Sequence, residues 1–275
     1  MPESPEVRHQ AKYLSARVQE GPLVEIEILS GRYIKKPIDN LDELRSRLPL
    51  KAIGGGAHGK FMYVILEDGS SIHSTLGMTG GWSDAPTKHA RIRMRFGSRE
   101  LFFNDTRNFG TFKWCRDRKC LVDKLESLGP DIMQEIDDSV FIASLRRKNH
   151  WNICKALMDQ SVVAGIGNYL KAEILYACEI DPRGAVADLD DAQLLAIRDQ
   201  AHRISWLSYE SGGATIQSYR NPDGSEGSFS RRFAVYGQET DPHGNRVEKV
   251  KVDDGRTTHW VPAVQSSEET TDGFY

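Results

Sequence analysis

The chain has 275 residues, of which 39% are hydrophobic and 27% charged, with a formal net charge of −3 and a pI of about 6.3. The length allows one or two domains with their own cores, and because no long apolar run or signal-peptide pattern is present we expect an intracellular protein rather than a membrane or secreted one. The slightly acidic balance argues against a uniformly basic nucleic-acid binder, although arginines gather in 91–107 and 146–147, as either a local basic groove or ordinary solvated faces.

The N-terminus carries a possible nucleophile. Removal of Met1 would leave Pro2 with a secondary amine, and an α-amino group of pKa about 7.7–8.0 is partly unprotonated at neutral pH. Such an amine attacks an aldehyde-like carbon to give an iminium, and the neighbouring Glu3 could move protons. The same residues also suit a plain helix start, and on this segment alone that interpretation is favoured.

The first half of the chain reads mainly as strands. Residues 5–18 have one apolar face and predict a helix. Alternating segments at 24–28 and 91–96 and apolar runs at 60–66 and 101–103 read as strands and are separated by turn residues. Several short strands at this spacing predict a β-sandwich.

After residue 130 the period becomes helical. Helices are predicted over 138–146, 150–160, 168–178 and 190–210, with Asp188 and Asp190 as N-caps and Gly212-Gly213 as the final stop. Residues 214–232 read as a loop containing an Asn221–Gly224 turn. Short strands follow at 233–236, 247–252 and 257–261, and we expect a disordered tail over 266–275.

The four cysteines, Cys115, Cys120, Cys154 and Cys178, form no Cys-x-x-Cys pair. They therefore read as reduced thiols of an intracellular protein. Cys115 and Cys120 are too isolated in the sequence to make a four-ligand zinc site.

Three further segments carry specific motifs. Gly59-Lys60-Phe61 enters a strand, and Leu76–Gly80 is followed by Asn104–Gly110. The block Asp159–Leu175 contains a Gly-x-Gly-Asn turn between two helices, where backbone N–H groups can face an anion and Asn168 can cap the second helix. Together with the Pro-Glu start, these segments resemble the formamidopyrimidine-DNA glycosylase/endonuclease VIII family of DNA repair enzymes, in the family's order from Pro2 to about residue 265.

The resemblance implies catalytic roles for three residues. Pro2 matches the nucleophile that attacks C1′ of the damaged nucleotide, and Glu3 matches the general acid/base. Lys60 matches a strand lysine that contacts the lesion phosphate. No metal or organic cofactor is expected for this chemistry.

It also implies residues that bind DNA. Met78, Arg107 and Phe109 match the three side chains that fill the space left by the everted nucleotide, where apolar wedges replace stacking and an arginine pairs with the orphaned base. Asn168 matches the turn asparagine on a phosphate beside the lesion, and His89 matches a phosphate-contacting histidine.

The C-terminus departs from the usual four-cysteine zinc finger, because no cysteine follows Cys178. Gly255–Trp260 still resembles the tip of the finger hairpin, which two strands can hold without metal if Trp260 packs against the domain. The segment thus resembles a zincless finger, with Arg256 on the phosphate of the extruded nucleotide; a surface turn arginine is the alternative.

The resemblance implies a two-domain α+β protein. Its expected parts are a catalytic β-sandwich domain flanked by helices at 1–127, a linker at 128–138, a helix–two-turn–helix domain at 139–232 and a zincless finger hairpin at 233–265. The implied activity is that of a bifunctional DNA glycosylase and abasic-site lyase acting by β,δ-elimination. We expect a monomer that acts on damaged double-stranded DNA, or on single strands, in the cytoplasm, nucleoid or nucleus.

Substrate preference is less determined. Oxidised pyrimidines, formamidopyrimidines and hydantoins are the favoured substrates. The alternative is an enzyme that prefers 8-oxoguanine, and the long glycine-containing segment 214–232 supports this alternative. A non-catalytic DNA-binding protein is the rival from another class, because helix–two-turn–helix modules also bind nucleic acid without chemistry. That rival needs neither a Pro2 amine nor Lys60.

Overall fold

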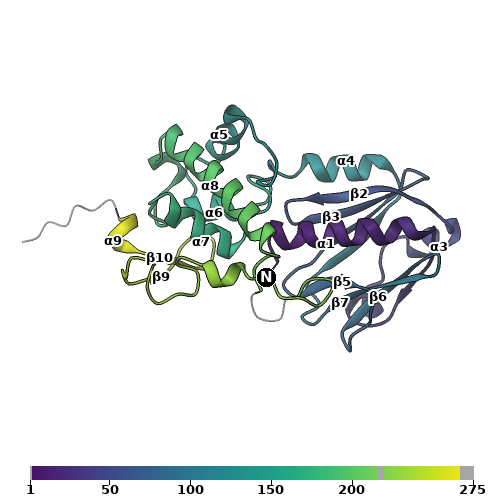
Figure 1. Cartoon of the computed structure of the whole chain (residues 1–275). Helices are drawn as coiled ribbons and strands as arrows, with labels where there is room; N and C mark the ends of the chain where they lie inside the picture. The colour runs from purple at the N-terminus through teal and green to yellow at the C-terminus, as the bar shows by residue number, and fades with distance from the viewer. Residues whose placement is uncertain (1, 216–219, 267–275) are drawn as a thin grey trace, which may run out of the picture. The chain divides into compact units, whose positions relative to one another are not determined.

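The computed structural model describes residues 2–215 and 220–266, which form two compact units. The first unit comprises the described residues of Met1–Leu128 and Leu207–Ser230. The second comprises Gly129–Trp206 and the described residues from Arg231 onwards. Figure 1 shows the strand-rich first part and the helical second part, in agreement with the predicted two-domain α+β class.

The first unit contains two four-stranded antiparallel sheets, which confirms the predicted β-sandwich. One has the order β1 (Leu23–Ile28), β6 (Ala90–Phe96), β7 (Arg99–Asp105), β5 (Gly80–Ser83). The other has the order β2 (Ala52–His58), β3 (Phe61–Leu66), β4 (Ser71–Thr75), β8 (Thr111–Cys115). Helices α1 (Ser4–Arg17), α2 (Arg32–Lys35), α3 (Leu41–Arg47) and α4 (Arg118–Glu126) accompany them.

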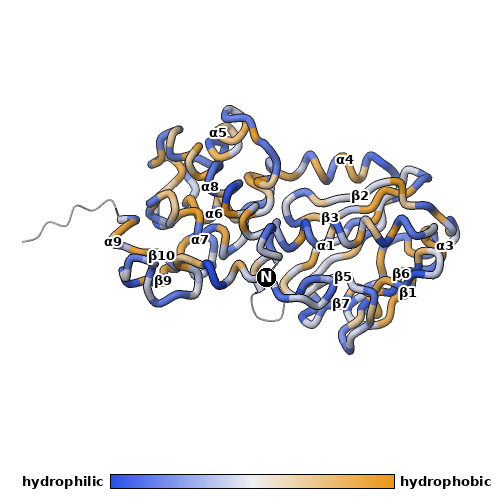
Figure 2. Tube along the Cα trace, in the orientation of Figure 1, coloured by the Kyte–Doolittle hydropathy of each residue, from blue (hydrophilic) through white to orange (hydrophobic). Residues whose placement is uncertain are grey.

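Helix α1 packs against β2 and β3 of one sheet and β5 of the other. Its predicted apolar face is buried through Val7, Ala11 and Leu14, and Val18 follows in the next turn. In Figure 2 the tube alternates between hydrophobic and hydrophilic colours along α1 and α4, as expected for helices with one buried face. The helix thus joins the cores of the two sheets and fixes the position of the N-terminus.

The arginines of β6 lie on the outer face of their sheet. Ile92, Met94 and Phe96 of this strand are buried, and the alternate positions are half-buried. Arg93 Nη2 and Arg95 Nε contact the carboxylate of Glu25 at 3.1 and 3.0 Å. These side chains therefore belong to a solvated sheet face, the second of the two interpretations of the arginine-rich stretch.

The second unit contains the predicted helices α5 (Asp138–Arg146), α6 (Ile153–Met158) and α7 (Asn168–Ala177), and most of the predicted α8 (Asp191–Glu210). It also contains a short helix that was not predicted, α9 (Pro262–Gln265), and the hairpin of β9 (Glu248–Lys251) and β10 (Thr257–Trp260). Ala172 of α7 shares a buried cluster with Val235, Val247 and Val261. Within the described residues no helix is long and apolar enough to cross a bilayer.

Some local expectations were wrong, and one falls almost entirely outside the described residues. Helices α2 and α3 interrupt a stretch that was predicted to be mostly strand. Asp190 accepts the Gln193 N–H at 2.8 Å and caps α8, whereas Asp188 lies in the 3-10 turn before it. The tail predicted over 266–275 falls, except for Ser266, outside the described residues.

The cysteines also differ from the expectation. Cys115 and Cys120 are joined by a disulfide, whereas Cys154 and Cys178 are free. The two bonded residues come from the end of β8 and the first turn of α4, so the turn between these elements brings them within bonding reach.

Candidate active site

The N-terminal residues are enclosed rather than frayed. Pro2 is buried, and Glu3 retains 1% exposure at the start of α1. The Glu3 N–H donates to Glu6 Oε2 at 2.8 Å, and the Ala214 N–H donates to Glu6 Oε1 at 2.7 Å. One carboxyl group therefore ties the start of α1 to the segment that follows α8.

Burial raises the pKa of Glu6 to about 7, and the backbone N–H groups of Ala214 and Glu3 offset only part of this effect. The neighbouring Gly213 has φ +85°, and a Cβ there would lie 2.9 Å from Glu6 Oε1. Glycine is thus required both by the backbone and by the space around the carboxyl group.

Lys60 lies beside the N-terminal segment. It occupies the turn between β2 and β3, next to Gly59, whose φ is +55°. Ser4 Oγ donates to the Gly59 carbonyl at 3.4 Å, so the chain around Pro2 and Glu3 contacts this turn. The three residues predicted to be catalytic therefore come from one unit and from two adjoining segments.

The residues predicted to fill the DNA void lie on two loops of the same unit. The buried carboxylate of Asp105 accepts the Thr79 hydroxyl at 2.5 Å and the Gly110 N–H at 2.7 Å. The Arg107 N–H donates to Thr79 Oγ1 at 2.9 Å. These bonds hold the turn that bears Met78 against the loop that bears Arg107 and Phe109.

The tips of these loops point outward. The Phe109 side chain is 52% exposed although it is aromatic, and the Arg107 guanidinium lies 5.0 Å from its ring centroid. His89 is half-buried nearby, and its carbonyl accepts the Asp105 N–H at 3.0 Å. The exposed ring of Phe109 and the cation above it leave a planar face open to solvent.

In the second unit, the glycine turn before α7 is fastened by Gln160. Its Nε2 donates to the carbonyls of Met158 and Ile166, both at 3.1 Å, and its Oε1 accepts the Gly165 N–H at 2.9 Å. Asn168 does not cap α7 as expected, because Gly167 is the N-cap residue and Asn168 is the first residue of the helix. Its Nδ2 instead donates to the Thr257 carbonyl at 3.0 Å, which links the turn to the finger hairpin.

Arg256 is exposed at the tip of the hairpin. Its N–H donates to Asp254 Oδ1 at 2.8 Å, and the other carboxylate oxygen of Asp254 pairs with Lys171 Nζ. Lys171 is completely buried, and the Asp254 side chain is 2% exposed. The turn that carries Arg256 is therefore anchored to α7 by a buried ion pair.

The segment 233–236 is not the strand predicted from its sequence. The N–H groups of Ala234, Val235 and Tyr236 converge on the carboxylate of Glu173 at 2.8 to 3.0 Å. Those donors would serve a neighbouring strand in a ladder, and here a side chain on α7 takes them. Trp260 packs into the domain at 5% exposure, as a hairpin without metal requires, with the Arg183 guanidinium 4.7 Å from its ring.

Three family models match the chain in succession. They describe the N-terminal domain of formamidopyrimidine-DNA glycosylase over residues 1–112, its helix–two-turn–helix domain over 128–220 and its C-terminal domain over 225–266. The chain belongs to the formamidopyrimidine-DNA glycosylase family. The predicted enzyme class, a DNA glycosylase with lyase activity at abasic sites, is confirmed by this membership.

Individual relatives agree. The formamidopyrimidine-DNA glycosylase of Oceanobacillus iheyensis is 31% identical over 98% of this chain and 99% of its own length, and that of Synechococcus elongatus is 30% identical over 96% and 97%. A Lactococcus lactis glycosylase variant, solved in complex with DNA containing Fapy-dG, superposes with a TM-score of 0.84 at 27% identity, covering 96% of this chain and all of that one. The Thermus thermophilus protein gives 0.83 at 29% identity, over 98% of this chain and 100% of its own.

Sequence reasoning missed Glu6, Lys171 and Glu173. Glu6 stands three residues after Glu3 at a helix start, a spacing typical of a capping box, which could have drawn attention to it. Lys171 and Glu173 carried no such signal. A charged residue within an apolar helical run shows its role only when its partner, distant in sequence, is known.

Proposed function

We propose that this glycosylase excises oxidised bases through a covalent intermediate on Pro2. The secondary amine attacks C1′ and displaces the damaged base, and after the amine loses its proton, cleavage of the C1′–O4′ bond opens the sugar ring and gives an iminium. Loss of the 2′ proton then breaks the 3′ C–O bond by β-elimination, and δ-elimination breaks the 5′ bond and leaves a one-nucleotide gap. Glu3 moves protons, and Lys60 contacts the lesion phosphate.

The arrangement of the N-terminus carries this proposal. Glu3 is buried beside Pro2 and so is shielded from bulk water, and the Ser4–Gly59 contact brings the Lys60 turn to the same segment. A frayed terminus would have neither feature. The non-catalytic alternative gives no reason for an enclosed Pro-Glu start.

We further propose that Met78, Arg107 and Phe109 fill the space of the everted nucleotide. Their support is the pair of loops held together by Asp105 and the 52% exposure of the Phe109 ring. Asn168, Arg256 and His89 are proposed to bind phosphates. The partner is damaged duplex DNA, bound by a monomer inside the cell.

For substrates, we propose formamidopyrimidines together with oxidised pyrimidines and hydantoins. The curated relatives above are named for formamidopyrimidines, and a related solved structure contains Fapy-dG DNA. An 8-oxoguanine preference is the second candidate, because another similar structure is described as a complex with carbocyclic 8-oxo-G DNA. Part of the segment that suggested it, 216–219, lies outside the described residues.

Borohydride trapping of the protein, with no tag preceding Pro2, tests the mechanism. Duplexes with an abasic site, dihydrouracil, thymine glycol, a hydantoin, a formamidopyrimidine or 8-oxoguanine are compared. We expect a covalent adduct that maps to Pro2 and is lost in Pro2→Gly. In Glu3→Gln, excision should fall while DNA binding persists.

The trapped lesions rank the substrates. Absence of an adduct on every duplex, the abasic one included, with DNA binding intact, would overturn the proposed covalent mechanism on Pro2. An adduct that survives Pro2→Gly and maps to a position other than residue 2 would move the nucleophile to another amine.

A further inference from the structure

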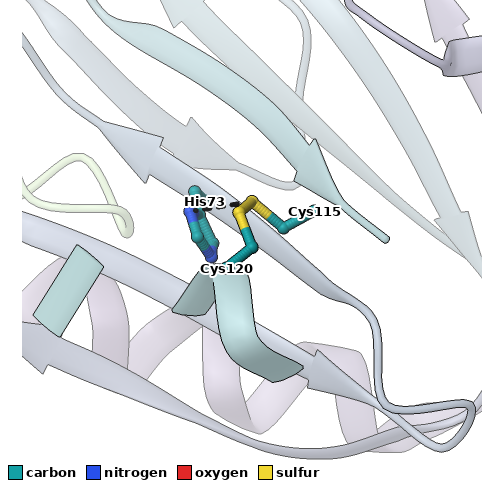
Figure 3. Close-up of side chains that lie close together, drawn as sticks. All are labelled: His73, Cys115 and Cys120. Atoms are coloured by element: carbon teal, nitrogen blue, oxygen red, sulfur yellow. Dashed lines mark hydrogen bonds between the residues drawn. A yellow bond between two sulfur atoms is a disulfide. The ribbon is translucent and has the colours of Figure 1, made fainter. Parts of the chain in front are cut away.

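Three side chains that can ligate soft metals meet at one edge of the second sheet of the first unit. His73 lies on β4, Cys115 ends β8, and Cys120 lies in the first turn of α4. Figure 3 shows the imidazole against the two sulfur atoms. One nitrogen of His73 and both Sγ atoms lie within 4.8 Å of one another. The proposed DNA chemistry uses none of the three.

The imidazole is held in one orientation. Nε2 lies 2.9 Å from Ser71 Oγ, and Nδ1 lies 3.5 Å from Cys115 Sγ. The Phe61 ring meets the imidazole edge-on with centroids 5.0 Å apart. When Nε2–H donates to Ser71, the lone pair of Nδ1 faces the sulfurs, which is the usual outer support of a metal-binding histidine.

The spacing between the histidine and one of the cysteines agrees with tetrahedral coordination. With Zn–S near 2.3 Å and Zn–N near 2.0–2.1 Å, sulfur and nitrogen on one tetrahedral zinc lie about 3.5 Å apart. Nδ1 and Cys115 Sγ have that separation, 3.5 Å. The Cα atoms of the two cysteines are 5.9 Å apart, so both sulfurs can reach one cation.

The surrounding charges are compatible with a bound cation. Lys113 and Lys124 interact electrostatically with His73. Two thiolates would cancel the charge of a divalent cation, so these lysines would not repel the occupied site.

Burial differs among the three residues. His73 and Cys115 are 6% and 2% exposed, whereas Cys120 is half-buried. A bound cation would therefore have protein on one side and access to water on the other. A site with three protein ligands and one open position is common for zinc.

We propose that His73, Cys115 and Cys120, in the dithiol form, bind a thiophilic divalent cation of the Zn²⁺ class, with water as the fourth ligand. The disulfide and the metal site are alternative states of the same two sulfurs, because each state needs both of them. The site is separate from the cysteine-free finger and lies in the other unit. Its occupancy would fasten the end of β8 and the start of α4 to β4.

The test uses the full-length protein, reduced and then freed of reductant without oxygen. Titration with Co²⁺ should give thiolate-to-cobalt charge-transfer absorption and the d–d bands of tetrahedral coordination, saturating at one ion per chain. Zn²⁺ should displace the cobalt, and competition with a chromophoric chelator gives its affinity. The same protein in its disulfide form should bind neither ion at this site.

Two variants isolate the ligands. Cys120→Ser changes the half-buried ligand and should abolish the charge-transfer band and weaken Zn²⁺ binding by more than about 100-fold, the upper range for losing only a supporting residue. Cys178→Ser, which removes a thiol outside the cluster, should bind as the wild type does. If the reduced wild type binds no more Co²⁺ or Zn²⁺ than Cys120→Ser, the cluster is a disulfide only and the proposal fails.

Discussion

Glu6 combines two properties that usually exclude one another. Its carboxyl group is buried, which favours the protonated form, yet both oxygens accept backbone N–H groups, which favours the ionised form. Burial wins, and the pKa rises from its ordinary 4.5 to about 7. The residue that joins α1 to the Gly213–Ala214 segment therefore titrates near neutral pH.

This residue predicts a pH dependence of folding. Because the folded state keeps the Glu6 proton at pH values where the unfolded chain has lost it, the contribution of Glu6 to stability falls as pH rises from about 4.5 to 7. A shift of this size corresponds to about 3 kcal/mol. Urea unfolding across this range should show a decrease in wild type that Glu6→Gln lacks.

The matched control is Glu126→Gln, because Glu126 is an exposed carboxylate on α4 of the same unit. It should keep the wild-type pH dependence. Equal slopes for wild type and Glu6→Gln would show that Glu6 titrates at its ordinary pKa.

Gly77 offers a second prediction at the residue scale. Its φ is +59°, and a Cβ there would lie 2.6 Å from Gly110 N and from the Phe109 carbonyl carbon. Gly77→Ala should therefore cost the left-handed penalty of about 1–2 kcal/mol and also push apart the loops that carry Met78 and Phe109. We expect lower unfolding free energy and slower single-turnover excision of a paired lesion.

Gly69→Ala separates the two effects. Gly69 has φ +84° but nothing within 4 Å of an added Cβ, so this variant carries the backbone penalty alone. Excision by Gly69→Ala should match the wild type. If the two variants behave alike, the close approach of the loops has no role in excision.

At the scale of elements, the finger hairpin depends on α7. Lys171 pairs with Asp254, Glu173 accepts three N–H groups of the segment before the hairpin, and Asn168 donates to Thr257. One helix thus supplies the polar contacts that fix the hairpin in place. Among the described residues, these contacts hold the hairpin in position, as a zinc ion does in fingers built on cysteines.

Removing Lys171 tests this dependence. Lys171→Met should destabilise the hairpin by about 3–5 kcal/mol, because the Asp254 carboxylate stays buried without its partner. Hydrogen exchange of the β9 and β10 amides measures the loss locally. The double variant Lys171→Met, Asp254→Asn should recover most of the protection, because asparagine leaves no charge and can still accept the Arg256 N–H.

If hydrogen exchange of the hairpin amides is unchanged in Lys171→Met, the ion pair makes no net contribution to the stability of the hairpin. Failure of the double variant to recover would point to lost packing of the lysine stem rather than to an uncompensated charge.

The hydrophobic pattern of short sequence windows predicted correctly those helices and strands whose buried face follows from that pattern. The alternation in 91–96 and the apolar face of 5–18 gave β6 and α1 because burial period and sequence period coincide there. Phe233–Tyr236 has an apolar, strand-like composition, but its N–H groups serve Glu173, a residue about sixty positions earlier. No window of sequence contains both partners, so that segment could not be predicted locally.

At the scale of the whole molecule, a net charge of −3 means that DNA affinity cannot come from overall attraction. Many arginines are already paired, as Arg99 is with Glu20 at 2.9 Å. We therefore propose that binding depends on a few placed cations such as Arg256, whose side chain is exposed on a turn fixed by Asp254.

This predicts a measurable salt effect. Arg256→Gln should lower the slope of log K against log salt for abasic-site duplex by about 0.9, the value for one phosphate contact, and weaken binding. Arg99→Gln should leave the slope unchanged because its charge is neutralised within the protein. Equal slopes for wild type and Arg256→Gln would remove Arg256 from the DNA interface.

The candidate site was predictable to the extent that its chemistry lies in short motifs. Pro2, Glu3 and Lys60 stand in recognisable segments, and those segments adjoin in the structure through the contact between Ser4 and Gly59. The cluster of His73, Cys115 and Cys120 was not predictable, because the histidine joins the cysteines only through the pairing of β4 with β8. The reduced state expected for these cysteines rested on spacing alone.

The buried pair between Lys171 and Asp254 also constrains how this chain can vary among descendants. Replacement of either residue alone leaves the charge of the other buried without a partner. The free-energy cost is comparable to a large part of the folding stability of a domain. A lineage that drifts one substitution at a time must therefore cross a poorly folded intermediate before reaching a neutral pair. We expect positions 171 and 254 to change together or not at all. A variant with only one of the two substitutions should contain little folded enzyme, even when Pro2 is intact.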